Sequence, residues 1–426
     1  MTVYRGGSGR VDGLPPTTGQ QPAPACDDEG VARPVNPWLM LMVGMAGQWA
    51  GTLVISTPPF LIPYLHLSQG VSLVSAGALA SAPAVGTMLT LVVWGLVVDR
   101  YGERRAMLAG LSLVTLGAIG TTTTSSLSAL SLWFFLCGVG VASTNAASGR
   151  LVVGGWFPAQ RRGLAMGIRQ TALPLGVGSA ALIIPNTVAG AGLRAACVVV
   201  AAVSLLATLA ALLIVDPPRP PRPTPGAEAR AANPYRQDAV LLRIHLASAL
   251  LVIPQYAVWT FLLLWLVDVH DWSVAAASIL VGATHTLSAA GRIVAGWWSD
   301  RLGSRLRPLR WIAVAATLVM VVLGVAQSSP VGIVVAVVAT VVTVSDNGLA
   351  FTAVAERAGA FWSGRAFGLQ NTGQYLTAAA VPPLLGVVVT HAGYGWAFGG
   401  VAVFAAAAVA LVPREAQPTS RDEHAR

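Results

Sequence analysis

Long apolar runs separated by short polar breaks limit what this chain can fold into more than any other feature of its sequence. The hydrocarbon core of a bilayer is about 30 Å thick, and a helix needs roughly 20 residues to cross it. The sequence therefore predicts an all-α integral membrane protein with twelve transmembrane helices in two halves of six. The predicted spans lie near 38–61, 71–98, 106–125, 128–152, 164–187 and 192–215, and near 240–267, 273–298, 309–327, 331–353, 364–389 and 393–412.

A short charged motif follows the second and the eighth of these runs, at an offset of 201 residues. Such a repeat indicates two related halves, and secondary transporters are commonly built from paired helical repeats around a central site. The same offset pairs Asn145 with Asp346 and Gln170 with Asn371. The two copies of the motif read Gly95-x-x-x-Asp99-Arg100-x-Gly102-x-Arg104 and Gly296-x-x-x-Asp300-Arg301-x-Gly303-x-Arg305.

Three segments have compositions that are not expected to form a membrane-spanning helix or part of a packed core. Residues 1–36 contain Gly, Pro, Asp and Arg without the apolar region of a signal peptide, and we expect a disordered cytoplasmic tail. Residues 216–238 hold seven prolines and four arginines, which predicts a cytoplasmic linker. The six-helix halves are then 37–215 and 239–412, and 413–426 is a second cytoplasmic tail.

Composition places most of the chain in lipid and sets its orientation. Of its residues, 55% are hydrophobic and 10% are charged, and its mean hydropathy is +0.68, values that no soluble domain of this length needs. The net charge of +9 comes from arginines in short loops, which is typical of cytoplasmic anchors and not of nucleic-acid binding. With both termini in the cytoplasm, every Arg except Arg169, Arg194 and Arg292 falls on the inner side. We therefore predict a multi-pass protein of the cell inner (plasma) membrane.

Patterns of catalytic chemistry are not found. Cys26, Cys137 and Cys197 are too scattered for a disulfide framework or a metal site. The sequence shows no P-loop, no metal-ligand spacing and no nucleophile elbow. We expect no enzymatic activity, no metal and no cofactor. The expected partners are the lipid bilayer, a small-molecule substrate and protons, with no nucleic acid, and the expected state is a monomer.

The repeated motif closely resembles the loop signature of the major facilitator superfamily, and the resemblance covers residues 38–412. It implies a carrier that rocks its two halves around a central site. Gly95 and Gly296 permit close helix approach, and Asp99 and Asp300 can accept from a neighbouring Arg or cap a facing helix N-terminus. We expect the ten residues of the motif to form a conformational gate. The alternative is a tight charged turn, with Arg104 and Arg305 acting only as anchors.

Two arginines lie inside predicted spans, where charges are expensive and mark a pathway. Arg292 lies eight residues before Asp300, and Arg169 lies eight residues after Arg161, so each is about 12 Å inside the cytoplasmic boundary. A guanidinium there offers a bidentate fork for a carboxylate or similar oxyanion. The alternative for Arg292 is a structural role, in which it pairs with Asp346 or a backbone carbonyl.

The spacing Arg292-x-x-x-Gly296-x-x-x-Asp300 resembles helix 8 of monocarboxylate and oxalate/formate-type carriers. That resemblance implies that Arg292 meets a substrate carboxylate. Monocarboxylate carriers keep an acid one turn earlier, where this chain has Ser288. Oxalate-type carriers add a basic residue in helix 11, where this chain has amides. A monovalent anion is therefore favoured over a divalent one.

Other polar side chains in the spans describe a polar lane through the bundle. Hydrogen bonding between helices is the simpler explanation for any one of them, but as a set they are candidates for substrate binding. Asp346, with His285 as a weaker alternative, is the titratable group deep enough to couple transport to protons. The candidate substrate-binding residues are Arg292, Arg169, Gln48, Asn145, Gln170, His285, Gln370, Asn371 and Gln374.

These patterns predict a secondary active transporter that moves a small organic anion, a monocarboxylate, by alternating access. Proton symport, anion exchange and uniport all remain open. A multidrug or metabolite exporter, with a cavity walled by aromatic residues such as Tyr256, Trp259 and Tyr375, is the alternative within the same superfamily. A non-transporting membrane sensor or a membrane-embedded enzyme is the alternative from another class.

Overall fold

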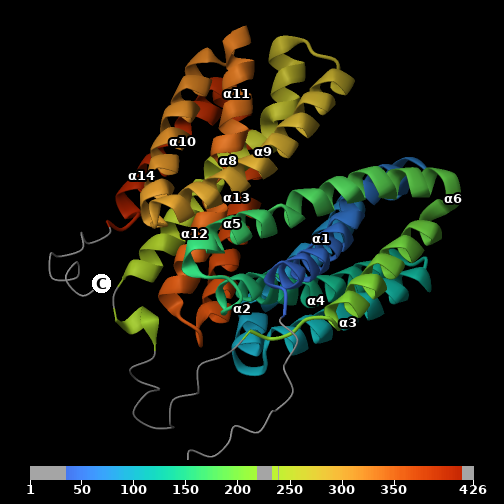
Figure 1. Cartoon of the computed structure of the whole chain (residues 1–426). Coiled ribbons are helices and arrows are strands. Elements are labelled where there is room, and N and C mark those ends of the chain that lie inside the picture. Colours follow the sequence, from blue (N-terminus) through green and yellow to red (C-terminus); the bar gives the residue numbers. More distant parts are fainter. Residues whose placement is uncertain (1–34, 218–232, 238, 415–426) are drawn as a thin grey trace, which may run out of the picture. The chain divides into compact units, whose positions relative to one another are not determined.

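The described part of the chain is almost entirely helical, as its apolar runs predict. The computed structural model describes residues 35–217, 233–237 and 239–414. Most of each predicted tail, 1–36 and 413–426, and most of the predicted linker 216–238 lie outside these residues. Figure 1 shows the helices of the first half in blue to green and those of the second half in yellow to red.

Each half consists of long helices joined by short turns. The first half contains α1 (Pro37–Leu67), α2 (Leu73–Tyr101), α3 (Glu103–Thr122), α4 (Leu127–Val153), α5 (Ala159–Gln170) and α6 (Ala172–Ala211). A short 3-10 helix, η1 (Pro234–Arg236), precedes the second half. That half contains α8 (Val240–His270), α9 (Val274–Leu302), α10 (Leu306–Ala326), α11 (Pro330–Val342), α12 (Asp346–Ala358), α13 (Ser363–Gly400) and α14 (Ala402–Leu411).

The twelve predicted spans all fall on these helices. Within the described ranges, nine helical segments are long and apolar enough to cross a membrane. Two of the nine, 159–211 and 363–411, each contain two predicted spans, and α9, which carries Arg292, supplies the remaining one. The all-α, twelve-helix fold is therefore confirmed.

The two double-length segments bend at glycines that are 201 residues apart. Gly192 has φ 81° and ψ 175°, and Gly393 has φ 82° and ψ 172°. Both values lie in a region that glycine enters without steric cost and other residues avoid. The internal repeat thus extends to the backbone conformation of these bends, where a sharp turn takes the place of a loop between two spans.

Two predicted spans are interrupted inside. The span at 164–187 is divided at Thr171, between α5 and α6, because Pro174 has no N–H to donate to the carbonyl of Gln170. The span at 331–353 is divided between α11 and α12, where the hydroxyls of Thr343 and Ser345 bond to carbonyls four residues earlier at 2.8 Å and 2.7 Å. Such side-chain bonds compete with the helical ladder.

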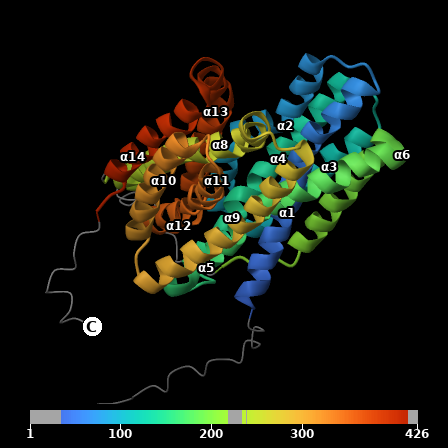
Figure 2. The same cartoon turned by 90° about the horizontal axis from the view of Figure 1, so that it is seen from above.

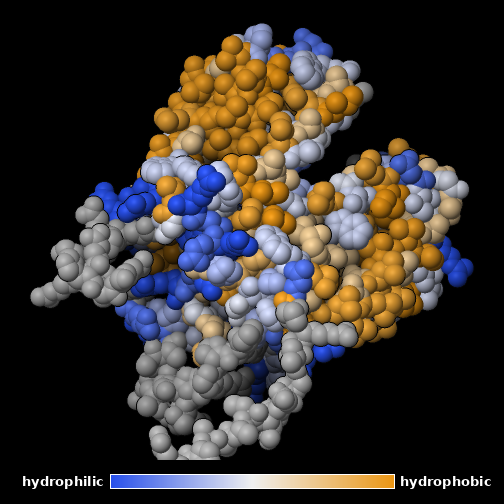
Figure 3. All heavy atoms as spheres, viewed as in Figure 1, coloured by the Kyte–Doolittle hydropathy of each residue, from blue (hydrophilic) through white to orange (hydrophobic). Residues whose placement is uncertain are grey.

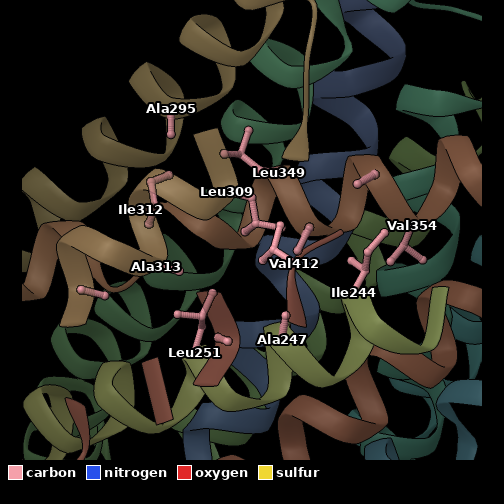
Figure 4. Close-up of a cluster of buried hydrophobic side chains, with 14 of the residues drawn as sticks. Ile244, Ala247, Leu251, Ala295, Leu309, Ile312, Ala313, Leu349, Val354 and Val412 are labelled. Atoms are coloured by element: carbon pink, nitrogen blue, oxygen red, sulfur yellow. The ribbon is translucent and has the colours of Figure 1, made fainter. Parts of the chain in front are cut away.

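Each half has its own apolar core. In the first half, Leu53 of α1, Val114 of α3, Phe134 of α4 and Val200 of α6 are fully buried together. In the second half, a cluster from α8, α10 and α12 includes Leu251, Leu309 and Leu349 (Figure 4). On the face shown in Figure 3, hydrophobic residues cover much of the outer part of both groups of helices, whereas hydrophilic residues gather near α5 and α12. This surface suits a protein that is surrounded by lipid.

The two halves meet where the charged motif and its partners lie, which we call the motif end. The closest contacts between halves join α2 to α13 and α5 to α9, and α5 lies alongside α9 in Figures 1 and 2. A Cβ atom added at Gly95 would lie 2.3 Å from the carbonyl oxygen of Gly364, and one added at Gly296 would lie 2.1 Å from that of Gly163. These glycines therefore let the helix backbones of opposite halves touch.

Candidate functional site

A cavity of about 190 Å³ lies between the two halves, and we call it the central cavity. Helices α1, α4, α5 and α6 form one wall, and helices α8, α9, α12 and α13 form the other. The shape of the cavity therefore depends on the relative position of the two halves. Its lining residues are Gln48, Thr52, Ile55, Ser56, Asn145, Gln170, Leu173, Val177, Val252, Gln255, Tyr256, Trp259, Arg292, Asn347, Phe351, Asn371, Gln374 and Tyr375.

Arg292 brings a positive charge to this lining, which contains no Asp, Glu, Lys or His. Its Nη1 donates to the backbone carbonyl of Gln170 at 2.7 Å, so the bond joins α9 of one half to α5 of the other. Within the described residues its Nε is buried without a hydrogen-bond partner. The guanidinium carbon also lies 5.9 Å from the ring centre of Trp259. The guanidinium therefore retains donor capacity that its protein partners do not use.

Amide side chains supply most of the other polar groups of the cavity. Five of the predicted residues, Gln48, Asn145, Gln170, Asn371 and Gln374, line it. In the first half, Nε2 of Gln48 donates to Oδ1 of Asn145 at 3.1 Å. These side chains combine donors and acceptors in a wall without acidic groups, which suits a polar or anionic solute.

The second half has its own amide network, which sequence reasoning found only in part. Asn347 donates to Oε1 of Gln255 at 3.0 Å and accepts from Nε2 of Gln374 at 3.0 Å. Gln374 also donates to Ser248 at 2.7 Å. Asn347 was missed although it is an amide within a predicted span and adjoins Asp346. The same signal that selected the other amides could have found it.

Three predicted substrate residues lie behind the cavity wall or beside it. Arg169 donates to Oε1 of Gln170 at 2.9 Å and to the carbonyl of Asn145 at 2.7 Å, so it holds two lining residues in place. His285 meets the ring of Trp259 edge-on, with ring centroids 5.1 Å apart. Gln370 hydrogen-bonds through Oε1 to His245. None of the three is among the lining residues.

Asp346 is the first residue of α12 and is almost fully buried, at 2% exposure. Its Oδ2 finds no hydrogen-bond partner within the described residues. No ion pair within 4.0 Å joins it to Arg292 in that part of the chain, and the direct hydrogen-bond partner of Arg292 there is the Gln170 carbonyl. Among the described residues, no group of three His, Cys, Asp or Glu side chains is placed to hold a metal ion.

At the motif end, Asp99 of α2 caps the start of α13 in the opposite half. Its carboxylate accepts from the backbone N–H of Gly364 at 2.8 Å and of Arg365 at 2.9 Å. It also pairs with Nε of Arg365 and Nη1 of Arg150, both at 3.0 Å. Arg150 in turn pairs with Glu103 at 2.6 Å. We call this set the Asp99 cluster.

Asp300 forms the counterpart, 201 residues later, and binds two backbone N–H groups within α5. Its carboxylate accepts from the backbone N–H of Gly163 at 2.9 Å and of Leu164 at 2.7 Å. Arg305 donates to Asp300 at 2.6 Å and pairs with Glu356 at 3.3 Å. Burial alone would lower the pKa of Arg305, but Glu356 and Asp300 outweigh burial and raise this pKa. Each half thus binds backbone N–H groups of a helix in the other half.

The two clusters differ in the origin of their arginine. Arg305 belongs to the second motif copy, whereas its counterpart Arg104 is exposed, and its backbone N–H donates to Asp216 at 2.7 Å. Arg150, from the end of α4, takes the corresponding place in the first half. The remaining motif arginines lie over aromatic rings, Arg100 over Tyr101 at 5.6 Å and Arg301 over Trp297 at 4.0 Å.

Two helical halves that enclose a central cavity, and that bind backbone N–H groups of each other's helices at one end, define a membrane carrier. The family model described as Major Facilitator Superfamily matches residues 38–382, and the chain belongs to this superfamily. It is 44% identical over 392 residues to an uncharacterized MFS-type transporter, Rv2994, of Mycobacterium tuberculosis, covering 91% of this chain and 87% of the relative. This resemblance extends the family assignment over nearly the whole length of both proteins.

More distant relatives are named as transporters of different compounds. The tetracenomycin C resistance and export protein of Streptomyces glaucescens is 31% identical over 34% of this chain and 26% of the relative. The probable nitrate/nitrite transporter NarK2 of Mycobacterium tuberculosis is 25% identical over 63% of this chain and 67% of the relative. The crystal structure of the transporter FucP in the outward conformation matches the fold with a TM-score of 0.75, at 15% identity, over 89% of this chain and 99% of that chain.

Proposed function

We propose that this transporter of the major facilitator superfamily moves a small monovalent organic anion, a monocarboxylate, by alternating access, with Arg292 as its chief contact. The observation that carries the proposal is the electrostatics of the central cavity. Arg292 is the charged side chain in a lining that holds seven Asn and Gln residues and no acid. In a low-dielectric site such a charge favours an anionic occupant, and its fork fits a carboxylate.

The cavity size and a relative support a small oxyanion. A volume of about 190 Å³ suits a small solute. NarK2, which is similar over 63% of this chain, is named as a probable transporter of nitrate and nitrite, two small monovalent oxyanions. A carboxylate shares their charge and their planar arrangement of oxygens. The surrounding amides then supply N–H donors to the oxygens that Arg292 does not contact.

Asp346 is the group that we propose for coupling to protons. A buried carboxyl with one oxygen unpartnered within the described residues can take up a proton without losing a hydrogen bond there. It adjoins Asn347, a lining residue, and lies on the same half as Arg292. Protonation during the transport cycle would make the carrier a symporter. We further propose that the motif end faces the cytoplasm of the plasma membrane, as the arginine distribution predicts.

Export of an aromatic compound is the second candidate. Tyr256, Trp259, Phe351 and Tyr375 line the cavity, and aromatic walls suit a flat apolar solute. The tetracenomycin export relative supports this reading over a third of the chain. An exporter of this kind would bind its compound through the rings and would not require the charge of Arg292.

Thermal-shift binding on detergent-purified protein separates the two candidates. The panel contains small monocarboxylates, oxalate, nitrate and cationic aromatic drugs, tested against wild type, Arg292→Gln and Arg292→Lys. We expect a monocarboxylate to raise the unfolding temperature of wild type, to have no effect on Arg292→Gln, and to have a reduced effect on Arg292→Lys, which keeps the charge without the fork. Equal stabilisation of wild type and Arg292→Gln, or stabilisation by drugs alone, would refute the anion proposal.

A further inference from the structure

The break between α5 and α6 leaves one backbone carbonyl without its helical donor. In a continuous helix the carbonyl of Gln170 would accept from the backbone nitrogen of residue 174. That residue is Pro174, which has no N–H. At the break itself, the N–H and the hydroxyl of Thr171 both bond to the carbonyl of Ile168, at 3.0 Å and 2.7 Å. Among the described residues, no backbone N–H donates to the Gln170 carbonyl.

This carbonyl is the one that Arg292 uses. Its Nη1 donates to it at 2.7 Å from the opposite half of the protein. The backbones of α5 and α9 touch beside this bond, because a Cβ atom added at Gly167 would lie 2.5 Å from the carbonyl oxygen of Arg292. Arg292 is 3% exposed, so its bond to Gln170 forms where water competes little.

We propose that Pro174 is a positioning residue for Arg292. By withholding an N–H, it leaves the Gln170 carbonyl as a cross-half acceptor that holds the guanidinium at the cavity wall and favours the closed state of the motif end. The other donors of the guanidinium stay available for an anion. The part of this inference that concerns an anion rests on the proposed function, whereas the tie between the halves does not.

Pro185, in the same helix, provides the matched control. It has no N–H to donate to the carbonyl of Ala181, four residues earlier. Within the described residues, no side chain donates to that carbonyl. Pro185 is exposed, so replacing it by Ala changes helix flexibility and lipid contact without touching Arg292. An effect that Pro174→Ala shows and Pro185→Ala does not show is therefore an effect of the carbonyl.

The test is a double-mutant cycle of Pro174→Ala and Arg292→Gln, read in full-length protein without ligand. Spin labels at the exposed positions Arg105 and Arg307, in a background without the three cysteines, report the distance between halves at the motif end by electron–electron double resonance. We expect Pro174→Ala to lower the ratio of closed to open molecules about fivefold, since one hydrogen bond is shared or lost. In the Arg292→Gln background we expect no further change, because the bond is already gone.

Two results would overturn the positioning role. One is an equal shift by Pro174→Ala in both backgrounds, which would make the proline a simple helix break. The other is no shift by Pro174→Ala or by Arg292→Gln in the ligand-free protein.

The anion part has its own readout, the apparent Kd of a monocarboxylate for the same variants. We expect Pro174→Ala to raise this Kd by at most the same factor, because a smaller fraction of molecules is in the competent state, while Pro185→Ala leaves it unchanged. If the ligand-free cycle is non-additive but no carboxylate binds wild type, the positioning role of Pro174 stands and the proposed substrate is wrong. If a carboxylate binds through Arg292 but the cycle is additive, the proposed substrate stands and the positioning role is wrong.

Discussion

Replacing Asp99 by Asn should open the motif end, because Asp99 carries the contact between α2 and α13. The carboxylate oxygen Oδ1 accepts from the N–H of Gly364, and Oδ2 accepts from both the N–H and Nε of Arg365. In Asn, one oxygen keeps the first bond. The amide NH2 group then faces the two donors of Arg365, so two bonds across the halves are lost.

The size of the effect follows from these two bonds. A hydrogen bond to a charged group contributes about 1.5–3 kcal/mol, so their loss costs about 3 kcal/mol at the lower end. That free energy lowers the ratio of closed to open molecules about a hundredfold, since each 1.4 kcal/mol changes an equilibrium constant about tenfold. Arg150 keeps its pair with Glu103, so the first half itself should remain folded.

The assay is the distance distribution between spin labels at Arg105 and Arg307 in the ligand-free protein. Asp216→Asn is the matched control, because Asp216 is also a carboxylate that accepts a backbone N–H, from Arg104, but this bond does not join the two halves. We expect a large open population in Asp99→Asn and a wild-type distribution in Asp216→Asn. A wild-type distribution in Asp99→Asn would show that the Asp99 cluster does not hold the halves together.

Three further perturbations test other parts of the account. Gly296→Ala places a Cβ 2.1 Å from the carbonyl oxygen of Gly163 and should open the motif end in the same distance measurement, whereas Gly282→Ala, in open space on the same helix, should not. Asp346→Asn should abolish uptake driven by a proton gradient in proteoliposomes and leave exchange intact; unchanged gradient-driven uptake would exclude Asp346 from coupling. Arg169→Ala removes three buried hydrogen bonds and should destabilise the fold by about 2 kcal/mol, seen as a lower unfolding temperature in detergent.

The fold could be predicted because a long apolar run is compatible with few kinds of structure. Runs of about 20 apolar residues favour membrane-spanning helices, and all twelve predicted spans lie on helices. The breaks inside spans were harder to see. Pro174 and the Thr343–Ser345 segment disturb the ladder through single hydrogen bonds, and such local competition does not change the hydropathy pattern.

The candidate site could be predicted only in part. A polar residue within a predicted span is a candidate for the site, but the sequence does not show which way its side chain points. Arg292 and Arg169 were both selected because a charge within a span is energetically unfavourable in lipid. In the structure, Arg292 lines the cavity, whereas Arg169 lies behind the lining and bonds to the carbonyl of Asn145. Arg150 was missed because nothing in the chain links residue 150 to residue 99 before folding. The capping of α13 by Asp99 was accessible from sequence, because the motif pairs a small residue with an acid one turn later.

Counterflow of a labelled monocarboxylate in proteoliposomes tests most directly whether Arg292 is the anion contact. Wild type, Arg292→Lys and Arg292→Gln are reconstituted at equal amounts and checked for folding by their unfolding temperatures. We predict saturable exchange by wild type, a raised KM for Arg292→Lys, and no exchange by Arg292→Gln. Exchange by Arg292→Gln with the KM of wild type would contradict the account and leave Arg292 as a tie between the two halves.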